Sequence, residues 1–169
     1  IWVKSGVYYP SIGYDRNRSF NVKPGVKVYG GFYGTETSLD QRDFVFNKAV
    51  LSGNIGNSSS TLDNSYHVVY FDSSQGSIGQ STRMDGFIIS DGYANGSTGT
   101  NSSGAGLYCD ADCNETCSPY LKHIEFKNNT AKFGGAIYND CNNNSDCRAI
   151  LEEVSFINNK ALFGGDGGA

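Results

Sequence analysis

The sequence predicts an all-β fold, a right-handed parallel β-helix that forms a single solenoid domain over residues 1–169. Three observations carry this prediction: a repeat of 30 residues near the carboxyl end, alternating apolar residues in short segments, and Asn or Gly between the segments. Alternation is typical of strands with one buried face. Asn and Gly tolerate the left-handed backbone of a sharp corner. We expect about six coils with lateral loops and uncapped ends.

The repeat is clearest in two segments. Residues 121–135 read LKHIEFKNNTAKFGG, and residues 151–165 read LEEVSFINNKALFGG. A weaker copy begins at Met84 and regains the offset of 30 after an insertion at residues 95–103. Short strands at a fixed period are typical of a solenoid. We read these regular repeats as residues 81–169.

Equivalent residues of successive coils should stack about 4.8 Å apart. Asn128 over Asn158 would form an amide ladder, because each carboxamide has donors and an acceptor. An inward-pointing Asn128 would be a poor acceptor for a glycan. Tyr108 should stack on Tyr138 in the same way. The stacking core would consist of Ile124, Phe126, Val154 and Phe156.

Residues 1–80 form irregular leading coils, in which residues 33–48 and 54–65 are expected to be lateral loops. The chain opens directly in a strand-like run without Met, and it closes partway through a coil. We therefore expect a fragment or repeat unit of a longer chain or fibre. Open coils expose unpaired backbone groups and apolar side chains, which should pair with another copy or with the remainder of a longer chain.

The cysteines indicate an oxidising compartment. Their spacing does not match paired CxxC zinc motifs, and they lie among loop-forming residues, so we expect disulfides. The pairs Cys113–Cys117 and Cys141–Cys147 are alternatives to a cross-coil bond between Cys117 and Cys147, and one cysteine is left over. The five candidates are Cys109, Cys113, Cys117, Cys141 and Cys147.

Seven N-x-S/T motifs also fit an extracellular chain whose surface carries glycans. They are mildly more frequent than the abundance of Asn, Ser and Thr alone would give. The candidate glycosylation sites are Asn17, Asn57, Asn95, Asn101, Asn114, Asn128 and Asn143.

The charge and the apolar content of the sequence disfavour some classes of partner. The net charge is −4, and basic residues do not cluster, which disfavours nucleic acid. The longest apolar runs are too short for a transmembrane helix. We expect neither a cofactor nor a bound metal. Weak calcium candidates are Asp110, Asp112, Asp140 and Asp146.

A polysaccharide lyase or hydrolase is the competing interpretation. Lys122 and Lys127 could act as a lyase base near acidic residues, and Asp110 and Asp140 occupy equivalent positions in neighbouring coils. Asp in such loops is more often a turn former. His67 is expected to be structural and His123 to face solvent.

The segments FKNNTAKFGGAIYN and FINNKALFGG resemble the polymorphic outer membrane protein repeat, through its GGAI element (residues 134–137) and its FxxN element (residues 126–129). The last copy has Asp166-Gly167 where Ala-Ile would be expected. IWVKSGVYYP and GVKVYGGFYGTETSLDQRD resemble the leading coils of large bacterial surface β-helix proteins. This resemblance implies a secreted or surface-displayed chain, often adhesive.

The predicted function is a non-enzymatic extracellular module. We expect a glycosylated surface fibre or adhesin segment that joins end to end through its open coils. A carbohydrate-binding or polysaccharide-cleaving β-helix is the alternative, since rows of tyrosine on a flat sheet can bind sugar rings.

Overall fold

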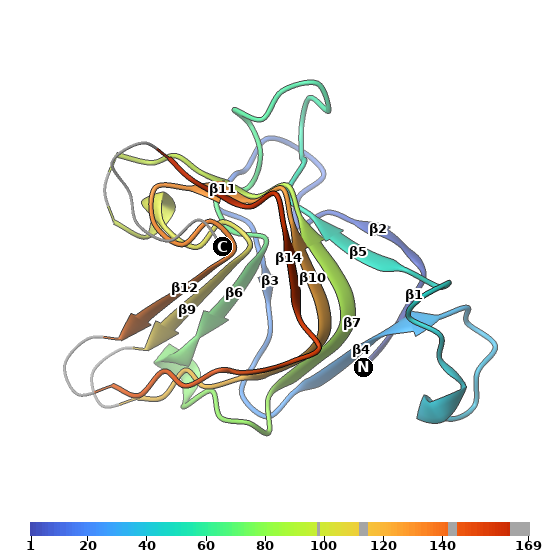
Figure 1. The fold of residues 1–169 in the computed structure, drawn as a ribbon. Helices are drawn as coiled ribbons and strands as arrows, with labels where there is room; N and C mark the ends of the chain where they lie inside the picture. Colours follow the sequence, from blue (N-terminus) through green and yellow to red (C-terminus); the bar gives the residue numbers. More distant parts are fainter. Residues whose placement is uncertain (98, 112–114, 142–144, 163–169) are drawn as a thin grey trace.

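The computed structural model describes residues 1–97, 99–111, 115–141 and 145–162. In this part of the chain the fold is all-β, with strands in three parallel sheets (Figure 1). Helical structure is limited there to three single-turn 3₁₀ helices: η1 (Leu39–Gln41), η2 (Ser73–Gln75) and η3 (Thr100–Ser102).

The largest sheet has eight strands in the described residues, with the path β1-β4-β7-β10-β13 and with β2, β5 and β14 beside it. Its strands are β1 (Trp2–Lys4), β2 (Gly6–Tyr8), β4 (Lys27–Phe32), β5 (Ala49–Ser52), β7 (Arg83–Ser90), β10 (Tyr120–Lys127), β13 (Ile150–Glu152) and β14 (Ser155–Ile157).

Two smaller sheets complete the described fold. The four-stranded sheet contains β3 (Phe20–Asn21), β6 (Val69–Asp72), β9 (Leu107–Ala111) and β12 (Ile137–Cys141). The three-stranded sheet contains β8 (Tyr93–Ala94), β11 (Thr130–Ala131) and β15 (Lys160–Ala161).

The chain visits the three sheets in turn. From β7 it passes to β8 and β9, returns to the large sheet at β10, and repeats this order through β11 and β12 (Figure 1). Strands of successive passages pair in parallel, and the register joins Tyr120 to Ile150 and Thr130 to Lys160. The offset of 30 in the sequence is therefore the offset between paired strands from β9 onward, whereas β7 and β8 pair with β10 and β11 at an offset of 37.

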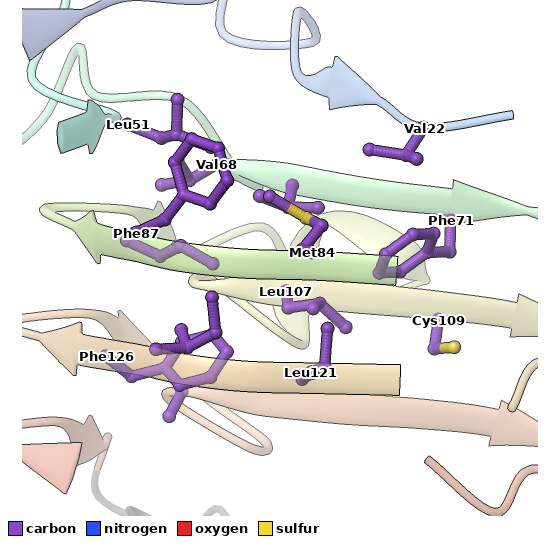
Figure 2. Close-up of a cluster of buried hydrophobic side chains, with 14 of the residues drawn as sticks. Val22, Leu51, Val68, Phe71, Met84, Phe87, Leu107, Cys109, Leu121 and Phe126 are labelled. Carbon is purple, nitrogen blue, oxygen red and sulfur yellow. The ribbon is translucent and has the colours of Figure 1, made fainter. Parts of the chain in front are cut away.

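Inward-facing side chains of the sheets form the main apolar core of the described structure (Figure 2), and Ala94, Ala105 and Ala131 form a smaller buried cluster. Phe126 is fully buried, and its ring stacks on that of Phe156 with a centroid distance of 5.5 Å and an interplanar angle of 8°. Ile124 is buried opposite Phe87, and Val154 packs against the same cluster. Ile124, Phe126 and Val154, predicted from the repeat, thus belong to this core, whereas Phe156 at the outer strand stacks on Phe126 and is 38% exposed.

An amide ladder crosses the corner after the large sheet. Asn129 is fully buried; its Nδ2 donates to the carbonyl of Ile89 at 2.9 Å, and its Oδ1 accepts from the N–H of Gly92 at 2.9 Å. Asn159 repeats this pattern one passage later, donating to the carbonyl of Phe126 at 2.9 Å and accepting from the N–H of Asn129 at 3.1 Å. Each amide therefore satisfies backbone groups of the preceding passage.

The prediction of Asn128 and Asn158 as the ladder is wrong by one residue. Both are exposed, with φ of 57° and 54°, and they form the left-handed step of the corner. Asn tolerates this conformation because its short polar side chain carries little steric penalty there. The step turns the next residue inward, and the ladder therefore falls on Asn129 and Asn159. The exposed side chain of Asn128 also removes the objection to its use as a glycosylation site.

A second left-handed step bends the large sheet itself. Gly86 (φ 84°), His123 (φ 49°) and Glu153 (φ 53°) lie at equivalent places in neighbouring passages. The bend has no clear signal in the sequence, because only one of these three passages has Gly at this place.

Two disulfides lie beside the four-stranded sheet. Cys141 is bonded to Cys147, one of the pairs predicted. Cys117 is bonded to Cys109, so the proposed Cys113–Cys117 and Cys117–Cys147 pairs are wrong. Cys109 faces inward from β9, and Cys117 is fully buried beside it, which brings the two sulfur atoms together. Cys113 lies outside the described residues.

Candidate functional site

A buried carboxylate marks the most highly charged cluster of the described structure. Asp85 in β7 is fully buried, and its Oδ1 lies 2.7 Å from Nη2 of Arg42 and 2.8 Å from Nδ1 of His123. Its Oδ2 accepts from Nε of Arg83 at 3.1 Å. A buried carboxylate needs such partners, because an unpaired charge away from water is strongly unfavourable.

These contacts decide how the carboxylate titrates. Burial alone would raise the pKa of Asp85. Hydrogen bonds from His123, Arg42 and Arg83 outweigh burial, and the pKa of Asp85 lies below its ordinary value. Asp85 is therefore ionised at neutral pH and serves as an anchor for Arg42, which belongs to the lateral loop between β4 and β5.

A cavity of about 220 Å³ adjoins this cluster. Its walls include Phe44, Lys48, His123 and Glu153. The ring of Phe44 stacks on His123 at a centroid distance of 4.2 Å, and Nε2 of His123 lies 3.3 Å from a carboxylate oxygen of Glu153. The prediction that His123 faces solvent is wrong, because the lateral loop covers it.

This arrangement is poorly suited to proton transfer. His123 has a carboxylate at each ring nitrogen, Asp85 at Nδ1 and Glu153 at Nε2. A general base needs a nitrogen within reach of the substrate proton. The geometry instead clamps the lateral loop to the bend of the sheet.

Tyrosines and aspartates form two neighbouring columns on the four-stranded sheet. Tyr108 stacks on Tyr70 at 5.3 Å and on Tyr138 at 5.6 Å between ring centroids. The hydroxyl of Tyr70 donates to Asp110, and that of Tyr108 donates to Asp140. Burial, followed by the contact with Asp140, raises the pKa of Tyr108. The Tyr108–Tyr138 stack was predicted, but Tyr108 is buried and offers no ring face to a sugar.

The acidic candidates within the described ranges do not gather into a metal site. Asp110 and Asp140 are in register on β9 and β12, and each accepts a hydrogen bond from a tyrosine hydroxyl. Asp146 pairs with Arg148 at 2.9 Å. Within the described ranges no group of three potential ligands is suited to hold a metal ion. Asp112 lies outside those ranges.

The lysines proposed as a lyase base are separated by their contacts. Lys122 forms an ion pair with Glu152, whose carboxylate also accepts a hydrogen bond from the hydroxyl of Tyr120. Lys127 is exposed at the end of β10. Neither lysine lies with Asp110 or Asp140, since these aspartates belong to a different sheet.

The glycosylation candidates differ in exposure. Asn17, Asn57 and Asn128 are exposed, and Asn95 and Asn101 are half-buried. Oδ1 of Asn95 accepts from Nη2 of Arg16 at 2.7 Å, which leaves the Nδ2 atom that a glycan would modify outside that contact. Asn114 and Asn143 lie outside the described residues.

The outer strands of the large sheet expose apolar side chains at both ends of the strand path. At one end, Val7 of β2 is 54% exposed and Trp2 of β1 is also exposed. At the other end, Leu151 of β13 is 46% exposed, and Phe156 and Ile157 of β14 are exposed beside it. These outer strands also have one backbone edge without a strand partner in the described structure.

Comparison of the chain with protein-family models, curated proteins and solved structures finds no match. In the described part of the chain, no helix has the length and apolar character needed to cross a membrane. The two disulfides are compatible with an extracellular protein, because such bonds persist in oxidising compartments.

Proposed function

We propose that the three parallel sheets are the faces of a right-handed parallel β-helix, and that this β-helix is a non-enzymatic extracellular module. The module acts as a segment of a glycosylated surface fibre or adhesin, assembled end to end. The observation that carries the proposal is the exposure of apolar side chains on the outer strands at both ends of the large sheet. The resemblance of the repeat to surface-displayed proteins supports the location.

The path of the chain supports the β-helix. A visit to each sheet in turn, followed by parallel pairing with the previous passage, is how a wound ribbon stacks its coils. The amide ladder supports the same interpretation, because the side chains of Asn129 and Asn159 each accept a hydrogen bond from a backbone N–H of the preceding coil. Connections between parallel strands of the same sheet are nearly always right-handed.

The occupant of the open edges is a second copy of this chain. β1 lies on the same strand path as β13, and β2 and β14 lie beside it through β5, β7 and β10. The register leads from Val7 through Val50, Ile88 and Glu125 to Ser155. A copy placed with its β1–β2 edge on β13–β14 therefore continues existing columns. In such a head-to-tail contact each copy contributes a different edge, so further copies can add at both ends and form a filament.

Sedimentation velocity over a range of protein concentrations tests the proposal. We expect the wild-type mass to rise beyond that of a dimer, because head-to-tail contacts do not close. Phe156→Lys should remain monomeric, since it places a charge on the pairing edge. Phe46→Lys is the matched control; this side chain is 85% exposed in the lateral loop between β4 and β5, and the variant should assemble like wild type. A wild-type chain that is monomeric at every concentration would contradict the assembly.

The alternative is a polysaccharide lyase or hydrolase, favoured by the in-register pair Asp110 and Asp140. A hydrolase would release new reducing ends from a polysaccharide, and a lyase would release unsaturated uronates, which absorb in the ultraviolet. We expect no rise in reducing ends or in absorbance with the wild-type chain. A rise that Asp140→Asn abolishes would replace the structural role by an enzymatic one.

A further inference from the structure

A polar groove lies at the corner between the large sheet and the three-stranded sheet, apart from the Asp85 cluster. Its volume is about 480 Å³, which is within the range of small-molecule sites, about 300–1,000 Å³. The lateral loop at residues 54–65 forms part of its wall. We call it the corner groove, and the lining side chains that the argument uses are Asp91, Tyr93, Asn128, Thr130 and Lys160.

Three of these residues form a row across the outward face of the three-stranded sheet. Tyr93 of β8 is in register with Thr130 of β11, and Thr130 is in register with Lys160 of β15. The residues that follow Tyr93 and Thr130, which are Ala94 and Ala131, are fully buried. Since successive side chains of a strand point to opposite faces, the row of Tyr93, Thr130 and Lys160 points outward.

Asn128 lies at the corner, two residues before this row. Its backbone is left-handed with φ of 57°, and its side chain is exposed, whereas the next residue, Asn129, is fully buried in the amide ladder. Asn128 and Thr130 form an N-x-T motif. Asn158 has the equivalent place in the next passage, but Lys160 stands where that motif needs Ser or Thr. An accessible acceptor for a glycan therefore borders the groove at Asn128 alone among these two corners.

We propose that Asn128 carries an N-glycan whose first ring, N-acetylglucosamine, lies in the corner groove with one face against the ring of Tyr93. The inference rests on the glycosylation in the proposed function. Nδ2 of Asn128 bonds to the anomeric carbon of a lipid diphosphate-linked oligosaccharide; the nitrogen loses a proton, and the diphosphate leaves with the electron pair. The side chain of Asn128 keeps the resulting sugar within reach of the groove.

The walls of the groove match the chemistry of this sugar. One face of a pyranose ring consists of C–H groups, which pack well on an aromatic ring such as that of Tyr93. The N–H of the acetamido group is a donor that the carboxylate of Asp91 can accept. The exposed ammonium group of Lys160 can donate to sugar oxygens. The groove thus offers an aromatic surface, an acceptor and a donor beside the one attachment point.

Site occupancy is the first test. The full chain is secreted from a eukaryotic host and trimmed with an endoglycosidase that leaves one N-acetylglucosamine on each glycosylated Asn. We expect peptide mass spectrometry to find this sugar on Asn128. If other N-x-S/T sites carry it and Asn128 does not, the inference fails while the glycosylated module stands. If no site carries it, the glycosylation in the proposed function fails as well.

A double-mutant cycle tests the contact with Tyr93. Asn128→Gly removes the glycan and keeps the left-handed backbone, and Tyr93→Ala removes the aromatic ring. In the trimmed chain, the loss of Tm for both changes together should be smaller than the sum of the single losses by about 3 °C. The same cycle in chain from a bacterial host without N-glycosylation should be additive. Equal coupling in the two forms would overturn the proposal.

Two further measurements complete the test. Asn57→Ala removes a glycosylation motif outside the groove, so its effect on Tm should add to that of Tyr93→Ala in the trimmed chain. Nuclear Overhauser contacts in the trimmed wild-type chain need no variant and keep the proposal testable if Tyr93→Ala fails to fold. We expect contacts between the sugar on Asn128 and the ring protons of Tyr93. An occupied Asn128 without these contacts would overturn the proposal.

Discussion

The two halves of the chain build the same columns in different ways. In the carboxyl-terminal half, the paired strands from β9 onward are 30 residues apart, and the sequence repeats visibly, as in Phe126 and Phe156. In the leading half, Tyr29 pairs with Asp85 across two lateral loops, and a sequence repeat is not evident. The register nevertheless continues, because Val28 lies beside Met84 and Leu51 beside Ile89.

The difference shows what the fold requires. Apolar inward positions must recur, but the length of chain between them is free. Extra residues leave the stack as lateral loops, and loop length has a small entropic effect on stability. Two arginines anchor the irregular segments of the leading half to the sheets.

The anchors are alike in design. Arg42 reaches from one lateral loop to Asp85 in the large sheet. Arg16 donates to the carbonyls of Asn64 at 2.6 Å and Tyr93 at 2.7 Å, and so joins another irregular segment to the three-stranded sheet. Planar guanidinium groups with several donors suit this bridging role.

The largest expected effect is in the core of the regular half. Phe126→Ala should lower the free energy of unfolding by about 4 kcal/mol, because it removes a fully buried ring. Phe32→Ala in the leading half should lower it by about 2 kcal/mol, since its stacking partner Trp2 is exposed. Urea unfolding measures both, with Phe46→Ala as an exposed control. Equal losses at Phe126 and Phe32 would remove the contrast between the halves.

The amide ladder should come next. Asn129→Ala should lower the free energy of unfolding by about 3 kcal/mol, because it leaves the N–H of Gly92 and the carbonyl of Ile89 without their partner. Asn128→Ala is the matched control. It should lose about 1 kcal/mol, from the left-handed backbone alone. A larger loss for Asn128→Ala than for Asn129→Ala in urea titrations would instead assign the ladder to Asn128.

The leading half should carry a distinctive pH dependence. The pKa of His67 is lowered from 6.5 to about 4 by burial, so the unfolded chain takes up a proton in this interval and the folded chain does not. Stability is therefore full above pH 6.5 and falls as the pH decreases toward 4. Between pH 8 and pH 5 the loss should be about 2 kcal/mol. His67→Phe should lack this loss; an equal slope in that variant would assign the effect to another group.

The smallest effect should be at the loop anchor. Arg42→Met should lower the free energy of unfolding by about 1.5 kcal/mol, because Asp85 keeps Arg83 and His123 as partners. Limited proteolysis should cut the lateral loop between β4 and β5 faster in this variant. A double-mutant cycle with Asp85→Asn measures the coupling, and a coupling near zero would show that the loop is held by other contacts.

The repeat predicted much of the carboxyl-terminal half. It placed Phe126 on Phe156 and Tyr108 on Tyr138, because a constant offset fixes the register of parallel strands. It could not decide which of two adjacent asparagines turns inward. That choice depends on the left-handed residue of the corner, here Asn128, which the period alone does not identify.

No local sequence pattern predicted the side-chain clusters beside the sheets. Arg42 and Asp85 are 43 residues apart and meet because a loop of irregular sequence folds back over the sheet. The corner groove combines separate segments in the same way. The Cys109–Cys117 bond was missed because several pairings satisfied the spacing, and the inward direction of Cys109 from β9 decides between them.

The central claim is that the outer strands of one copy continue the columns of another. The register that leads from Val7 to Ser155 allows a direct test by disulfide cross-linking. We predict that Val7→Cys combined with Ser155→Cys gives a ladder of covalent oligomers on oxidation. Val7→Cys combined with Ile157→Cys, two residues out of register, should give far less, and oxidised wild-type chain measures the background from native cysteines. Equal cross-linking by the two pairs, or none above background, would contradict the claim.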